Sequence, residues 1–200
     1  MFHTHPTTTA ILKTAKKIYN PIFEHVAHYP NGGFAVSDKY RLFWTGDISG
    51  EPTLPTAPDL KYTDITKIIP VEINYDLSFQ FQKSYVRSFK AFLAVAKLTY
   101  NNTCKIEIQQ DKIIFSIEDI SLGLDSKLTF KMDIYENRIV DFEDLTFNLN
   151  LEYLTDFLLS FEFGENGFNM FGMYIKQVNG VTAPIILTNG TYNYLMALLK

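Results

Sequence analysis

The strongest constraint on the fold of this 200-residue chain is a pattern that occurs twice in its C-terminal two-thirds. Residues 71–134 predict a strand, a helix and then three strands, and residues 144–199 predict the same order again. The helical segments have apolar residues three and four positions apart, whereas the strands alternate apolar and polar residues. The two segments share this order and their length but not their residue identities. The chain is therefore predicted to be an α+β protein with repeated β-α-β-β-β units.

The boundaries of the predicted elements follow from this periodicity and from turn residues such as Asn189-Gly190. In the first unit we expect a strand at Val71–Leu77, a helix from about Gln80 to Leu98, and strands at Thr103–Gln109, Lys112–Glu118 and Ser126–Ile134. In the second unit we expect a strand at Asp144–Leu149, a helix from Asn150 to about Ser160, and strands at Phe168–Lys176, Ala183–Thr188 and Tyr192–Leu198.

The first 70 residues predict a smaller lobe. Residues 1–7 are expected to form a loose tail, and a threonine at positions 7–9 should cap a helix that ends near Tyr19. A hairpin is predicted at residues 34–45, whereas residues 22–29 have no clear pattern. The proline-rich stretch that follows the hairpin is typical of an extended linker.

The domain boundary is expected in or just after this linker. Residues 1–70 are then a partial lobe made of a helix, a hairpin and the linker, and residues 71–200 are a complete domain of two units. The length of the chain allows one large domain or two small ones, and 46% apolar residues are enough for a sizeable core.

Charge and cysteine content narrow the function classes. The net charge is −4, which argues against a protein that is basic on all sides but allows a local basic face. Cys104 is the single cysteine, so a disulfide framework is impossible. No secretory signal and no apolar run of membrane-spanning length is visible, so we expect an intracellular, cytoplasmic protein without a membrane partner.

Basic residues form a stripe on each of two predicted helices, opposite the apolar face. Phosphate backbones of nucleic acid are the obvious partner for such stripes, although solvated helix faces are often basic as well. The third predicted helix carries Glu152 and Asp156 at comparable positions, which weakens the nucleic-acid interpretation. The candidate DNA-binding residues are Lys13, Lys16, Lys17, Lys83, Arg87, Lys90 and Lys97.

Several local strings resemble the bacterial sliding clamp, the beta subunit of DNA polymerase III. Residues Ser37–Leu42 are similar to the Thr-Asp-Gly-His-Arg-Leu hairpin of that family. Residues Pro58–Pro70 resemble the linker into its last domain, and residues Phe147–Phe157 resemble its Phe-Asn-Val-x-Tyr-Leu-x-Asp segment. Residues Ala183–Leu198 resemble its closing hairpin, which ends Tyr-x-x-Met-Pro-Met. The strings occur in the order and spacing of the family across almost the whole chain.

The resemblance implies a sliding-clamp fold, with helices on one face of antiparallel sheets. It also implies a processivity factor for DNA replication that holds a polymerase on duplex DNA, without enzymatic activity and without a cofactor. Family members have three full domains per subunit, whereas this chain predicts about one and a half. A ring could therefore close only as a homo-oligomer. The alternative is a clamp-like interaction module or regulator that does not encircle DNA.

The resemblance further implies a hydrophobic pocket beside the C-terminus that binds short peptide motifs of replication partners. Apolar residues on strands are also typical of an ordinary core, so both interpretations stay open. The residues carried over to this pocket are Leu42, Pro70, Tyr194, Leu195, Met196 and Leu198.

Other chemistry has weaker support. His25 and His28 are spaced one helical turn apart, but no cysteine accompanies them, so surface histidines are favoured over a metal site. No nucleophile signature of a hydrolase is present.

Overall fold

The computed structural model describes residues 2–62, 75–82, 85–99, 102–131, 136–137, 144–159, 170–178 and 181–199. Its helices are α1 (Pro6–Ala15), α2 (Tyr85–Ala96) and α3 (Leu151–Leu159), with short 3-10 turns η1 (Phe2–Thr4), η2 (Lys16–Ile18), η3 (Pro21–Glu24) and η5 (Ile120–Leu122). The strands before α3 are β1 (Ala27–His28), β2 (Phe34–Ser37), β3 (Arg41–Thr45), β4 (Leu77–Gln82), β5 (Thr103–Gln109), β6 (Lys112–Asp119), β7 (Leu124–Lys131), β8 (Glu136–Asn137) and β9 (Leu145–Asn150). Those after it are β10 (Met170–Ile175), β11 (Gln177–Val178), β12 (Val181–Thr182), β13 (Ile185–Thr188) and β14 (Tyr192–Met196).

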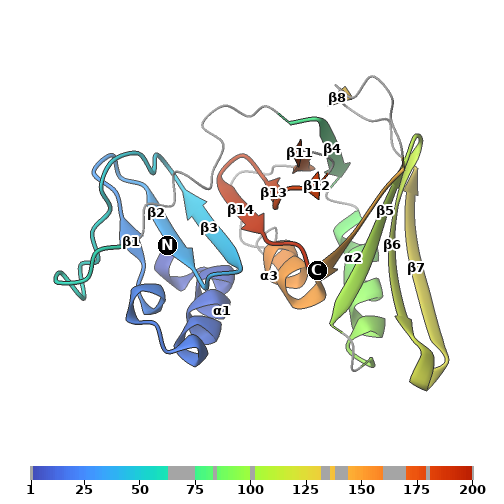
Figure 1. Cartoon of the computed structure of the whole chain (residues 1–200), viewed down its shortest axis with the longest axis horizontal. Helices are drawn as coiled ribbons and strands as arrows, with labels where there is room; N and C mark the ends of the chain where they lie inside the picture. Colours follow the sequence, from blue (N-terminus) through green and yellow to red (C-terminus); the bar gives the residue numbers. More distant parts are fainter. Residues whose placement is uncertain are drawn as a thin grey trace.

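Two antiparallel sheets organise the molecule (Figure 1). The larger sheet has the order β1-β2-β3-β14-β13-β10-β4-β8, and the smaller has the order β7-β6-β5-β9. In the larger sheet β3 pairs with β14, with Leu42 opposite Leu195, so the first lobe and the C-terminal hairpin share one ladder. In Figure 1, α1, α3 and α2 follow one another from left to right, with α1 and α3 below strands of the larger sheet and α2 beside the smaller sheet.

The predicted repeat is confirmed in its order. The first unit is β4-α2-β5-β6-β7, and the second is β9-α3-β10-β13-β14 with the β11–β12 pair inserted. The two units exchange their first strands, because β9 pairs with β5 of the first unit and β4 pairs with β10 of the second. Each sheet therefore depends on both units, and neither unit has a complete sheet by itself.

The predicted start of the second helix was wrong. Residues 80–82 belong to β4, and α2 begins at Tyr85. Phe79 and Phe81 are buried while Gln80 and Gln82 are exposed, which is the two-residue period of a strand.

The expected loose tail is in fact packed, and the predicted threonine cap was wrong. The Phe2 ring is buried and stacks on Phe43 with a centroid distance of 5.2 Å. His5 is the N-cap of α1, since its Nδ1 accepts a hydrogen bond from the Thr7 amide. Pro6 follows at the first helical position, where its missing N–H costs nothing.

Two apolar clusters cover the two faces of the larger sheet. The larger cluster lies between the sheets and the helices and includes Ile11, Phe89 and Phe157. The smaller cluster covers the outer face and includes Trp44 and Tyr62. Within the part of the chain that the structure describes, no helix is long and apolar enough to cross a membrane.

Candidate nucleic-acid interface

A pocket with a volume of about 420 Å³ lies where α1, α2 and α3 meet. Its walls include Lys13 from α1, Lys17 from the turn that continues α1, and Lys97 just beyond α2. Glu152 and Thr155 line it from α3. The packing of α3 against both other helices therefore brings Lys97 to the same hollow as Lys13 and Lys17, which are distant from it in the sequence.

The remaining candidate DNA-binding residues lie outside this pocket. Lys16 and Arg87 are exposed, and Lys90 is half-buried on α2. Lys83 lies outside the described residues. The structure thus gathers part of the predicted basic set at the pocket and leaves its other described members on the adjoining helix surfaces.

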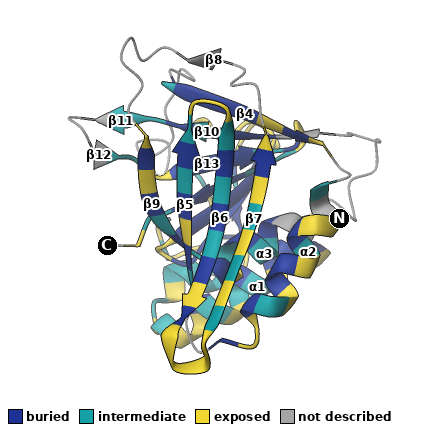
Figure 2. Cartoon of the chain, turned by 90° about the vertical axis from the view of Figure 1, so that its right-hand side faces the viewer, coloured by how far each residue is buried: buried dark blue, intermediate teal, exposed yellow. Residues whose placement is uncertain are grey.

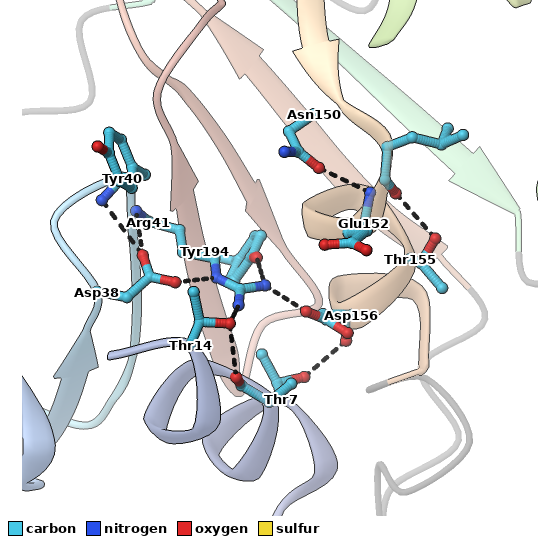
Figure 3. A network of polar contacts seen from close by, with 12 residues as sticks. Thr7, Thr14, Asp38, Tyr40, Arg41, Asn150, Glu152, Thr155, Asp156 and Tyr194 are labelled. Carbon is cyan, nitrogen blue, oxygen red and sulfur yellow. Dashed lines mark hydrogen bonds and ion pairs between the residues drawn. The ribbon is translucent and has the colours of Figure 1, made fainter. Parts of the chain in front are cut away.

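Arg41 lies beneath this pocket and connects four elements (Figure 3). The Arg41 side chain is 2% exposed, and its Nε donates to Asp38 Oδ2 over 2.6 Å. Its Nη1 forms an ion pair with Asp156 of α3, and its Nη2 donates to Thr14 Oγ1 of α1 over 3.0 Å. The same guanidinium lies 3.4 Å from the Tyr194 hydroxyl of β14. Arg41 therefore ties the hairpin to α1, α3 and the C-terminal strand.

The network changes the electrostatics of the pocket. Burial raises the pKa of the Asp156 carboxyl, and the positive charge of Arg41 offsets part of that rise. Arg41 pairs with Asp38 as well as with Asp156, so these three side chains hold one more acidic than basic group, and Glu152 is a further acidic group on the pocket wall. Sequence reasoning identified Asp156 only as an unwanted charge, and it missed Arg41 as a structural residue. The available signal was an arginine inside the apolar run 41–45, because buried charges are normally paired.

Of the six residues predicted for the peptide pocket, the five that the structure describes do not share one face. Leu42 and Leu195 point to the outer face of the larger sheet, whereas Tyr194 and Met196 are fully buried on the helix side. Successive residues of a strand point to opposite faces, so β14 cannot present all of its predicted members to one pocket. Leu198 packs against the helix-side cluster, and Pro70 lies outside the described residues.

The outer face has a hollow of its own. A cavity of about 600 Å³ is lined by residues of the segment 50–62 that follows β3, among them Leu54, Leu60 and Tyr62. These three side chains also pack in the same cluster as Leu42 and Leu195. The sequence interpretation treated this segment as a linker and missed its contribution to the outer face.

Metal and thiol chemistry gain no support from the geometry. Among the described residues, no three His, Cys, Asp or Glu side chains form a group that could hold a metal ion. His25 Nδ1 lies 2.8 Å from Thr56 Oγ1, and the His3 and His28 rings are 5.2 Å apart. Burial raises the pKa of the Cys104 thiol to about 12, so this cysteine is protonated near neutral pH.

Neither a protein-family model nor a curated protein sequence matches the chain. Solved structures of bacterial sliding clamps do match it. The DNA polymerase III beta subunit of Thermotoga maritima aligns with a TM-score of 0.68 and 12% identity, over 97% of this chain and 64% of that chain. The beta subunit of Streptococcus pyogenes gives 0.61 and 15%, over 96% and 64%. The Helicobacter pylori beta clamp bound to a DNA ligase peptide gives 0.63 and 12%, over 98% and 64%.

The chain therefore has the fold of a bacterial sliding clamp, as the resemblance of the local strings predicted. More narrowly, it is similar to the beta subunit of DNA polymerase III and spans less than two-thirds of the length of the clamps that it matches. At 12–15% identity the likeness establishes the fold, and the function depends on the chain's own residues.

Proposed function

We propose that this chain is a clamp-like processivity factor of DNA replication that contacts duplex DNA through the face formed by α1, α2 and α3. The observation that carries the proposal is the convergence of Lys13, Lys17 and Lys97 on one pocket of an otherwise acidic chain. Lysine ammonium groups contact phosphates without reading base edges, so binding would be independent of sequence. The protein would act by holding partners on DNA, in the cytoplasm, with no chemistry of its own.

The charge distribution supports contact with a polyanion on this face. Lys16 and Arg87 are further exposed basic residues on the adjoining helical segments, and Arg41 offsets part of the charge of Asp38 and Asp156. A net charge of −4 for the whole chain does not oppose such contact, because local fields are screened over roughly 8–10 Å at physiological salt. Encirclement of DNA would require a ring of several copies, since one copy matches 64% of one clamp subunit.

Partner binding is proposed for the outer face of the larger sheet. The DNA ligase peptide on the Helicobacter pylori clamp shows that a clamp of this fold accepts a peptide. In the present chain Leu42 and Leu195 are buried in the same cluster as Leu54, Leu60 and Tyr62, which help to line the cavity. Short apolar motifs of a polymerase or another replication protein fit such a surface. The predicted pocket is thereby restricted to the residues that face outward.

A salt titration of DNA binding tests the proposal. Affinity for a fluorescent duplex should fall as salt rises, with a slope of about 0.9 per phosphate contact. The triple variant Lys13→Ala, Lys17→Ala, Lys97→Ala should lower both the affinity and the slope. A matched control is Lys105→Ala, Lys112→Ala, Lys131→Ala, because these lysines alternate with buried residues and lie on the face of the smaller sheet away from the helices.

The outcomes separate two functions. Equal slopes for the triple variant and its control would rule out the helix face as the DNA contact. The exposed Glu152 among the lysines favours the alternative, a clamp-like interaction module that does not encircle DNA. That alternative predicts peptide binding that Leu60→Asp, at the wall of the outer cavity, weakens, with no retention of the protein on circular DNA.

A further inference from the structure

The pocket where α1, α2 and α3 meet carries charges of both signs on different walls. Lys13 and Lys17 line it from α1 and the turn that continues α1, and Lys97 lines it just beyond α2. Glu152 lines it from α3. All four residues are exposed, and within the described part of the chain none of them forms an ion pair. The ammonium groups and the carboxylate therefore line one hollow without pairing with each other.

The same pocket also has an apolar part. Leu93 and Ala96 of α2 and Leu151 of α3 line it, and all three are buried. Figure 2 shows the three helices close together, with buried residues of α2 in dark blue beside exposed ones in yellow. The volume of about 420 Å³ lies within the range of small-molecule sites, which combine apolar walls with a few polar groups. A ligand that complements these walls has an apolar body, an anionic group and hydrogen-bond donors.

We infer that this pocket takes a single nucleotide, with its phosphate toward the lysines and a guanine base toward Glu152. The phosphate pairs with the lysine ammonium groups. Guanine presents two neighbouring donors, N1–H and the N2 amino group, which one carboxylate accepts as a bidentate pair. Adenine and cytosine have an acceptor nitrogen beside the amino group, and thymine has one N–H between two carbonyl groups. A carboxylate therefore meets repulsion from every base except guanine.

The two acidic residues of the pocket have different roles in this arrangement. Asp156 is already paired with Arg41. The backbone amide of Glu152 donates to Asn150 Oδ1 over 2.9 Å, so the cap fixes this end of α3 while the Glu152 side chain stays exposed (Figure 3). The Glu152 carboxylate can therefore accept the base without breaking a contact that holds the fold.

Two sources of ligand share this chemistry, a free guanine nucleotide and an unpaired guanine on a DNA strand. A guanine paired with cytosine already uses N1–H and the N2 amino group, so duplex DNA cannot offer this edge to Glu152. The inference rests on the proposed function for the role of the lysines as phosphate contacts. Glu152 adds a preference for one base, whereas lysine contacts to a duplex are independent of sequence.

Nucleotide binding to the native chain, measured by calorimetry, tests the pocket. The chain should bind dGMP about tenfold more tightly than dAMP or dTMP, because a bidentate pair to a base edge discriminates by at least that order. For the strand source, an oligothymidine with one central guanine should bind more tightly than the same strand with a central adenine. Preference for guanine in the first comparison identifies a free nucleotide as a ligand, and preference in the second identifies an unpaired base.

Glu152→Gln separates base recognition from a general effect of charge. It removes a negative charge, so it should strengthen binding of duplex DNA, yet it should remove the preference for dGMP because an amide cannot accept two donors from one base. Glu51→Gln makes the same replacement on the exposed segment after β3 and should retain the preference. The triple variant Lys13→Ala, Lys17→Ala, Lys97→Ala should weaken all nucleotides alike, since they share the phosphate.

The inference would be overturned by a native chain that shows no preference for guanine in either comparison, or by a preference that Glu152→Gln retains. Both results would leave the proposed contact with duplex DNA standing. Conversely, equal salt slopes for duplex binding by the triple variant and its control would remove the duplex contact without touching the comparison between bases. The two proposals can therefore fail separately.

Discussion

The helices α2 and α3 occupy the same position in the two repeats, but their polar faces have opposite characters. α2 exposes Arg87 and is followed by the exposed Lys97. α3 exposes Glu152 and directs Asp156 into the ion pair with Arg41. The repeated unit therefore determines the backbone order, while the polar face of each helix follows what that helix contacts.

The contacts explain the difference. α3 packs between α1 and α2, and its polar side faces the first lobe. An acidic residue is useful there because the buried Arg41 needs a partner. α2 packs on β7 at the open edge of the smaller sheet, where its polar face meets no other described element that needs a carboxylate. α3 therefore connects the first lobe to the rest of the molecule, whereas α2 leaves Arg87 exposed to solvent.

The largest effect on stability is expected when Arg41, which connects the hairpin to α1 and α3, is replaced. Arg41→Ala should lower the free energy of unfolding by about 3–5 kcal/mol, because it leaves the fully buried Asp38 and the partly buried Asp156 without their counter-charge. Arg87→Ala on the exposed surface of α2 should change the free energy of unfolding by less than about 0.5 kcal/mol. Urea unfolding followed by circular dichroism measures both values. Similar losses for the two variants would contradict the distinction between the buried, paired Arg41 and the exposed Arg87.

A smaller loss of stability is expected at acidic pH, because His5, which caps α1, becomes protonated. Burial lowers the pKa of His5 from 6.5 to about 4, so the folded protein keeps the imidazole neutral where the unfolded chain protonates it. The neutral imidazole of His5 makes its full contribution to the free energy of unfolding above about pH 6.5, and this contribution is lost as the pH falls toward 4. The loss should approach 3 kcal/mol on an order-of-magnitude scale. It should loosen α1, which His5 caps, from α3.

The measurement is the difference between two pH profiles of unfolding free energy. His5→Asn keeps a good N-cap without a titrating group and should flatten the profile between pH 6.5 and 4. Asp156 acts in the opposite direction, since burial raises its pKa, so the difference between variant and native protein is more informative than either profile alone. His25→Asn serves as the control for replacing a histidine by asparagine elsewhere in the chain. A native profile in His5→Asn would show that His5 carries no pH dependence.

The sequence predicted the order of both repeats because their elements have strong periods, such as Ile106 and Ile108 alternating with polar neighbours on β5. It could not predict that β4 and β9 exchange sheets, since pairing between distant strands depends on tertiary packing that no local pattern encodes. The N-terminal tail was missed for a similar reason. Phe2 is ordered by its ring contacts with Phe34 and Phe43, which lie on a hairpin more than thirty residues away.

The candidate sites were predicted unequally. Helical spacing identified Lys13, Lys17 and Lys97 as surface residues but gave no sign that α3 would bring them together. The peptide pocket was carried over as a contiguous set, although β14 alternates its side chains between two faces. Met196 shows the consequence: it is fully buried on the helix side, so Met196→Ala would report core packing instead of peptide binding.

The smallest effect is expected when single charges are removed from the pocket, at Lys97 beyond α2 and at Glu152 of α3. Lys97→Gln removes a possible phosphate contact, so it should weaken duplex binding severalfold and lower the salt slope by about 0.9. Glu152→Gln removes a repulsive charge from the same pocket without adding a contact, so it should strengthen binding with little change in slope. Glutamine keeps the length of each side chain approximately, which limits effects on helix packing. If both variants changed the affinity for DNA in the same direction, the opposite charges of Lys97 and Glu152 would have no opposite effects on DNA binding. The contrast between α2 and α3 would then concern stability alone.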